Sequence, residues 1–231
     1  MRTLGLIGGM TWHSTVDYYR LINAGVQERL GGSHSADLLL LSIDFKPVED
    51  MQGRGDWAGM GKLMGEWARR LEAAGAEGLV ICTNTMHRLA DDVLAAVRIP
   101  LIHIADATAG AVTKKGLATV GLLGTRYTME LDFYRGRLEK AHGLKVLIPE
   151  EPGRTAINDI IYRELSHGII REESRQVYAA VIRELERRGA QGVILGCTEI
   201  PLLIKAADSP IPVFDTTALH AAAAVEFALA G

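Results

Sequence analysis

The sequence predicts an α/β protein made of two pseudo-symmetric copies of one unit, each with a parallel sheet flanked by helices. Apolar strand-like runs alternate with helical patterns along the whole chain, as in parallel α/β sheets. Residues 75–85 and 189–199 share two glycines and match in kind at three strand positions at an offset of 114, which aligns Thr83 with Cys197. Two further echoes, 5–9 with 121–125 and 99–101 with 211–213, follow in the same order at offsets of 116 and 112.

The composition is that of a globular protein without a nucleic acid or membrane partner. The 231 residues are 48% hydrophobic and 23% charged, which suits two lobes of about 110 residues each. A net charge of −3 favours neither nucleic acid nor an anionic membrane, and no apolar run approaches the roughly 20 residues of a membrane helix. The start reads as a first strand and not as an export signal, so both cysteines are expected to be reduced thiols in the cytoplasm.

The first half is expected to contain four strands with helices between them. Residues 37–43 contain four consecutive leucines, which predicts a central strand, and residues 44–55 read as a polar loop after it. Gly5, Gly8 and Gly9 do not fit a dinucleotide fingerprint, so a nucleotide site is not expected. The expected strands are 3–8, 37–43, 78–82 and 99–104, and the expected helices are 14–30, 56–74, a stretch after the turn at 83–87 that ends near 96, and 106–115 capped by Asp106.

The second half repeats this pattern. The expected strands are 117–123, 144–148, 193–196 and 211–214, and the expected helices are 130–142, 154–166, 171–188 and 216–230. We expect a first lobe of residues 1–105 plus 212–231 and a second lobe of residues 106–211. Because no Pro/Gly/Ser-rich linker separates the copies, the lobes are expected to pack closely.

Two polar turns follow equivalent strands, and ligands bind at the carboxyl ends of such strands. If the copies face each other about a pseudo-twofold axis, Thr83 and Cys197 approach a small ligand from opposite sides. Racemisation at a carbon next to a carboxylate needs this geometry, because one group removes the proton and the other returns one to the opposite face. A thiol suits the task, since neighbours can lower its pKa from about 8.5.

Hydroxyl and amide groups in the same turns are candidates to hold a carboxylate and the charge that develops on the carbanion. These candidates are Asn84, Thr85, Thr125, Thr128 and Thr198. No lysine context indicates a pyridoxal Schiff base and no Cys/His cluster indicates a metal, so no cofactor is expected.

The chain resembles the aspartate/glutamate racemase family, the cofactor-independent two-base racemases. The motifs Gly8-Gly9-Met10, Thr83-Asn84-Thr85-Met86-His87 and Gly196-Cys197-Thr198-Glu199 occur in the family's order and spacing. The resemblance spans essentially the whole chain. It implies two flavodoxin-like lobes, an active site in the cleft between them, an acidic amino acid as substrate and a homodimer. It also implies a site lined by Met10, Gln52, Asn84, Thr85 and Thr198, together with the Thr125 turn.

One residue departs from the family pattern. Typical members have cysteine immediately before the Asn-Thr pair, where this chain has Thr83; Cys82 lies one place earlier and is expected to point to the other side of the strand. The resemblance implies that the second-half cysteine is the base that acts on the L-enantiomer. Our hypothesis is therefore that Cys197 is the base for L-aspartate and/or L-glutamate and that Thr83, a poor resting base, is the opposite-face donor. The L-enantiomer should then turn over faster than the D-enantiomer.

Several assignments stay open at this point. A helix dipole, His87 or Glu199 are candidates to assist Cys197. The cation that selects the substrate side chain is not singled out, and Ser166 stands near where some relatives have a lysine, which leaves aspartate against glutamate open. The candidate cations are Lys46, Arg54, Arg163, His167 and Arg171. A carbanion-forming decarboxylase of the arylmalonate type and a non-catalytic amino acid-binding protein are the alternatives, and deuterium incorporation at Cα separates a racemase from a binder.

Overall fold

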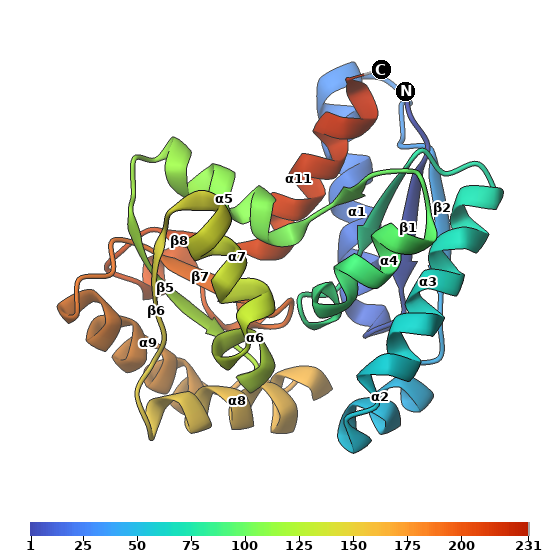
Figure 1. Ribbon diagram of the computed structural model, residues 1–231. Coiled ribbons are helices and arrows are strands. Elements are labelled where there is room, and N and C mark those ends of the chain that lie inside the picture. Colours follow the sequence, from blue (N-terminus) through green and yellow to red (C-terminus); the bar gives the residue numbers. More distant parts are fainter. Residues whose placement is uncertain (231) are drawn as a thin grey trace. The chain divides into compact units, whose positions relative to one another are not determined.

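The computed structural model describes residues 1–230, which fall into two compact units (Figure 1). Unit 1 contains the chain up to Ile104 and again from His220, and unit 2 contains Ala105–Leu219. The chain therefore passes between the units twice, once after Ile104 and once before His220.

Unit 1 is built on four parallel strands in the order β2-β1-β3-β4. Leu6 and Val80 pack with residues of helices α1 and α11 on one face of the sheet, and Ile7 and Ile81 pack with α3 on the other. This alternation follows from the opposite directions of successive strand side chains. The elements are β1 (Leu4–Gly8), α1 (Trp12–Leu30), β2 (Leu38–Ser42), α2 (Phe45–Arg54), α3 (Trp57–Ala73), β3 (Gly78–Ile81), the 3-10 helix η1 (Thr85–Leu89), α4 (Ala90–Ala96), β4 (Leu101–Ile102) and the second part of α11 (Thr216–Leu229).

Unit 2 has the same strand order, β6-β5-β7-β8, again with every neighbouring pair parallel. The predicted α/β fold class, with two parallel sheets flanked by helices, is therefore confirmed. The elements are α5 (Ile104–Lys114), β5 (Thr119–Gly124), α6 (Arg126–Glu130), α7 (Asp132–His142), β6 (Lys145–Leu147), α8 (Gly153–Arg163), η2 (Leu165–His167), α9 (Glu172–Arg187), β7 (Val193–Gly196), α10 (Ile200–Leu203), η3 (Ala206–Asp208) and β8 (Val213–Asp215).

Two expectations about residues 37–55 were wrong. β2 is an edge strand that pairs only with β1, and Leu40 is 46% exposed. The run of leucines suggested a strand buried on both faces. In the structure Leu39 and Leu41 pack on the core, while Leu40 faces outward. Most of the segment 44–55 forms helix α2 (Phe45–Arg54) in place of a loop. The Asp44 side chain caps it by accepting from the Lys46 amide at 3.1 Å, and a left-handed Gly55 ends it.

The end of the chain also differs from the expected division. β8 pairs with β7 in the second sheet, so residues 213–215 belong to unit 2, whereas the range 212–231 was assigned to the first lobe. The reason is that the return to unit 1 occurs inside α11 and not before β8. α5 starts at Ile104, and Asp106 lies in its first turn, where Arg137 binds it at 2.7 Å. Within residues 1–230, no helix is both long and apolar enough to cross a membrane.

Candidate active site

The turn after β1 requires glycine. Gly9 has a positive φ of 94°, and a Cβ atom there would lie 2.3 Å from the Ile43 carbonyl oxygen. The Gly9 amide donates to Thr15 Oγ1 at 2.8 Å, which fixes the turn against α1. Met10 is only 5% exposed and belongs to the same core cluster as Met60 and Met86. Met10 is thus mainly a core residue of unit 1.

The turn after β3 holds Thr83 through both of its backbone groups. The Thr83 amide donates to the Ile81 carbonyl at 2.8 Å, and the Thr83 carbonyl lies 2.8 Å from His87 Nδ1. The Thr83 side chain is half-buried, and its hydroxyl makes no hydrogen bond to any residue that the structure describes. Asn84 is buried and Thr85 is half-buried at the start of η1. The predicted catalytic threonine therefore has a fixed backbone and an uncommitted hydroxyl.

Two further residues of unit 1, Gln52 and Cys82, lie next to this turn. Gln52 on α2 donates from Nε2 to the Met86 sulfur at 3.3 Å, so α2 brings Gln52 to the 83–87 turn. A loop over residues 44–55 would not have fixed the position of Gln52, whereas helix α2 does. Cys82 is fully buried in the cluster that packs against α1 and α11, and burial raises the pKa of its thiol. Cys82 therefore has the role of a buried apolar residue.

Cys197 follows β7 and is bonded to a carboxylate. Its Sγ donates to Glu199 Oε2 at 2.9 Å, and the Thr198 hydroxyl donates to the same oxygen at 2.7 Å. Cys197 is 9% exposed. Burial, and next the charge of Glu199, raise the pKa of the Cys197 thiol well above its usual value. Neighbours can lower the pKa of a thiol, but here the nearest charge is negative and the following helix α10 has only four residues.

The turn after β5 supports the end of β7. The pairing of Gly124 with Gly196 sets Thr125 and Cys197 at the same edge of the second sheet. Thr125 caps α6, and its hydroxyl lies 3.3 Å from that of Thr128. A Cβ atom on Gly196 would lie 3.1 Å from the Thr128 methyl carbon, so this fully buried threonine packs directly against the Gly196 backbone. Thr128 thus has a packing role beside its predicted binding role.

His87 is a packed, neutral histidine of unit 1. Its Nε2 lies 3.3 Å from the Ile104 amide, and its Nδ1 lies against the Thr83 carbonyl, so both ring nitrogens are occupied. Burial, and next the neighbouring His103 and His220, lower the pKa of His87 well below its usual value. Glu199 and not His87 is therefore the group bonded to Cys197, and its place two residues after the cysteine was the only signal for it in the sequence.

The five candidate cations for the substrate side chain differ in whether they already form ion pairs within the protein. Lys46 pairs with Asp50 at 2.6 Å and with Glu49 at 3.3 Å. Arg163 and Arg171 pair with Asp159 and Glu164 at 3.4 and 3.6 Å, and the Ser166 hydroxyl donates to the Ile161 carbonyl. Arg54 and His167 have no ion-pair partner within residues 1–230. These two remain the least committed of the five.

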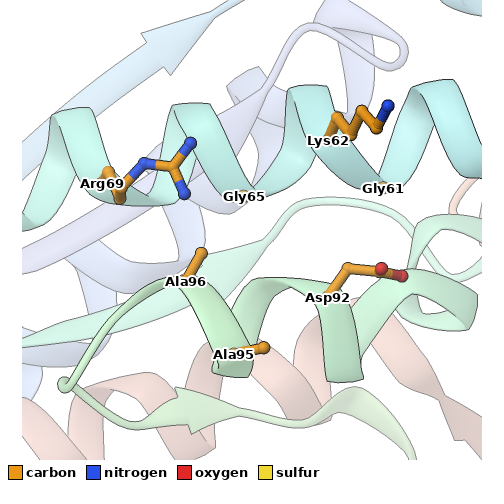
Figure 2. Close-up of a pocket in the computed structure, with 7 residues that line it drawn as sticks. All are labelled: Gly61, Lys62, Gly65, Arg69, Asp92, Ala95 and Ala96. Carbon is orange, nitrogen blue, oxygen red and sulfur yellow. The ribbon is translucent and has the colours of Figure 1, made fainter.

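A hollow of about 270 Å³ lies between α3 and α4 on unit 1 (Figure 2). Its base is the close approach of the two helices, because a Cβ atom on Gly61 would meet the Asp92 carboxylate at 2.8 Å and one on Gly65 would meet Ala96 at 3.1 Å. None of the predicted site residues lines it. Its lining residues are Gly61, Lys62, Gly65, Arg69, Asp92, Ala95 and Ala96.

Buried neutral histidines predict a loss of stability in mild acid. Burial lowers the pKa of His220 to about 4 from its usual 6.5. The unfolded chain then binds a proton that the folded chain excludes, so the stabilisation is complete above pH 6.5 and is lost as the pH falls towards 4. The effect is on the order of 3 kcal/mol for this one group. Urea unfolding across this pH range measures it, and a His220→Gln variant should show a shallower dependence; an equal slope in both proteins would contradict the prediction.

Comparison with known proteins adds the following findings. The sequence model of the family described as Asp/Glu/Hydantoin racemase matches residues 7–224. The broad specificity amino-acid racemase RacX of Bacillus subtilis (strain 168) is 24% identical over 230 residues, which cover 98% of each chain. A candidate Asp/Glu racemase of Yersinia pestis is 55% identical with a TM-score of 0.95, covering 99% of this chain and 100% of that one. An aspartate racemase homologue of Pyrococcus horikoshii OT3 is 36% identical with a TM-score of 0.85, covering 99% of each.

Proposed function

Because this chain belongs to the Asp/Glu/hydantoin racemase family, we propose that it is an isomerase that racemises aspartate, glutamate or both without a cofactor. The observation that carries the proposal is the Cys197–Glu199 contact of 2.9 Å at the end of β7. Thr83 follows β3, the equivalent strand of the first sheet. We propose that these two strand ends act on one substrate from opposite faces of its Cα.

The proposed reaction begins with a proton transfer within the Cys197–Glu199 pair. The S–H bond breaks, the proton moves to the Glu199 carboxylate, and the thiolate removes the α-proton of the L-substrate. The raised pKa of Cys197 makes this thiolate a strong base once it forms, and the existing bond to Glu199 orients the transfer. The electron pair left at Cα spreads into the substrate carboxylate, which hydroxyl and amide groups of Asn84, Thr85 and Thr198 are proposed to hold.

Thr83 completes the proposed inversion. Its hydroxyl donates a proton to the opposite face of Cα. Solvent then reprotonates the Thr83 oxygen, and Glu199 releases to solvent the proton that it took from Cys197, so both groups return to their starting states. An alcohol is a far weaker acid than a thiol, so Thr83 is a poor base for the reverse reaction. The equilibrium constant between enantiomers is one, so kcat/KM is equal in both directions and the difference appears at saturating substrate. There, α-proton exchange should be faster from the L-enantiomer than from the D-enantiomer.

A Thr83→Cys substitution should raise α-proton exchange from the D-enantiomer by about tenfold or more, because it supplies a competent base on that face. Thr83→Ser is the matched control, since it keeps the hydroxyl and should stay close to the parent rate. Exchange at saturating D-aspartate or D-glutamate in D2O measures the effect. An unchanged D-exchange rate in a folded Thr83→Cys protein would count against Thr83 as the opposite-face residue.

Proton NMR in D2O with each enantiomer of aspartate and glutamate tests the proposed function itself. Loss of the α-proton signal with formation of the other enantiomer is the expected result, and the substrate that reacts names the preference. Exchange without formation of the other enantiomer would indicate a one-base enzyme. No exchange with any of the four would sink the acidic-racemase proposal and favour the decarboxylase or the binding protein.

We further propose that the protein is a cytoplasmic homodimer. Trp12, Val16 and Tyr19 are 61%, 54% and 55% exposed. Their spacing on α1 puts them on one face of the helix, where they form an apolar stripe. Such a stripe favours association with another surface. Light scattering on the purified protein measures the mass of the particle, and a monomer at micromolar concentration would contradict this part of the proposal.

A further inference from the structure

The chain leaves unit 1 at one point and re-enters it at another, and at each point a histidine ring lies within hydrogen-bond distance of a backbone group. At the first, the Ile104 amide lies 3.3 Å from His87 Nε2. At the second, His220 is itself the first residue back in unit 1, and its Nε2 lies 2.7 Å from the Ile102 carbonyl. His220 Nδ1 lies 2.8 Å from the Tyr18 hydroxyl on α1. The two crossovers are therefore tied to the same small region of unit 1.

The partners of these rings fix their tautomers. An amide N–H only donates, so His87 Nε2 carries no proton and His87 Nδ1–H donates to the Thr83 carbonyl. A carbonyl only accepts, so His220 Nε2 carries the proton and Nδ1 accepts from Tyr18. The ring centroid of His87 lies 4.7 Å from that of His103 and 5.4 Å from that of His220. A proton added to His87 would face the Ile104 N–H, so the neutral ring is the one that fits.

We propose that His87 is a positioning residue, which sets the direction of the Thr83 side chain and couples it to the first crossover. This inference rests on the proposed role of Thr83. The Thr83 amide is held by Ile81 and the Thr83 carbonyl by His87, each at 2.8 Å, so the peptide planes on both sides of its Cα are fixed. Release of the carbonyl frees one of them, and a displacement near 1 Å costs a reaction about 100-fold.

Two substitutions separate the two bonds of His87. His87→Asn places an amide N–H near the position of Nδ1, so it keeps the donation to Thr83 and loses the acceptor for Ile104. His87→Gln reaches to the position of Nε2, so it keeps the acceptor and loses the donation to Thr83. The readout is a ratio measured in D2O with saturating L-substrate. Formation of the D-enantiomer reports delivery from the Thr83 face, and deuterium in the recovered L-enantiomer reports removal and return on the Cys197 face.

The expected result is a ratio of inversion to retention about tenfold lower in His87→Gln and near the parent value in His87→Asn. A general loss of structure would lower both rates together, and thermal unfolding of each variant identifies it. An unchanged ratio in a folded, active His87→Gln protein would overturn the positioning role alone. Parent protein that neither exchanges nor inverts any acidic amino acid would overturn the proposed function, and the positioning role with it.

A second measurement does not depend on activity. Nitrogen-15 NMR of the imidazole rings at neutral pH should show two uncharged histidines of opposite tautomer, Nδ1–H for His87 and Nε2–H for His220. Amide hydrogen exchange at Ile104 should speed up in His87→Asn and remain slow in His87→Gln. A charged His87, or an Nε2–H tautomer at His87, would overturn the inference.

Discussion

Replacing Cys197 with alanine is expected to lower both α-proton exchange and racemisation of the acidic substrate by about 1,000-fold or more. The physical reason is that general acid–base groups contribute about 100- to 10,000-fold, and this thiol is proposed to act in both directions. Loss of the α-proton signal in D2O measures exchange, and chiral chromatography measures racemisation. The substitution removes one nine-tenths buried sulfur and leaves Glu199 and Thr198 in place.

The second cysteine provides the matched control. Cys82 is also a buried thiol in the turn region of an equivalent strand, but it faces the core that packs on α1 and α11. Cys82→Ala should keep kcat within about threefold of the parent while it lowers the melting temperature slightly, because it leaves a small cavity. A Cys197→Ala protein that keeps a tenth or more of the parent activity would contradict the assignment of Cys197 as the base.

Replacing Glu199 with glutamine should lower kcat for the L-enantiomer by about 100-fold at neutral pH, because the thiol then loses its proton acceptor. The same change should lower the pKa of Cys197, since the Glu199 charge is, after burial, the largest cause of the raised value. The remaining activity of the variant is therefore expected to rise with pH as the thiol ionises directly. Ultraviolet absorbance of the thiolate and the pH profile of kcat measure the two effects.

A glutamate of the same unit serves as the control for this change. Glu164 is partly buried and accepts from the Ser174 hydroxyl, and it makes no hydrogen bond to Cys197. Glu164→Gln should leave the pH profile at its parent shape. If Glu199→Gln keeps both the parent kcat and the parent pH profile, Glu199 is not the proton acceptor of Cys197.

The prediction from sequence was most successful where the signal was repeated. The echo at an offset of 114 placed β3 and β7 in equivalent positions, and the two sheets do share one strand order. Prediction failed where pairing partners decide the outcome. A leucine-rich segment such as 37–43 looks the same in a central strand and in an edge strand, and only the partners of β2 distinguish them. The capping signals of Asp44 and Gly55 were present in the sequence and were outweighed by the polar character of the segment between them.

By itself, the sequence determined that this protein is a repeated α/β chain with Thr83 and Cys197 after equivalent strands. Strand–helix periodicity and turn residues are local properties, so they can be read without coordinates. Only the tertiary structure decided how the pKa values of the candidate site are shifted. Burial and the charge of Glu199 raise the pKa of the Cys197 thiol, and burial and the neighbouring His103 and His220 lower the pKa of His87. Desolvation and electrostatic fields depend on neighbours in space, and the order of residues along the chain does not specify those neighbours.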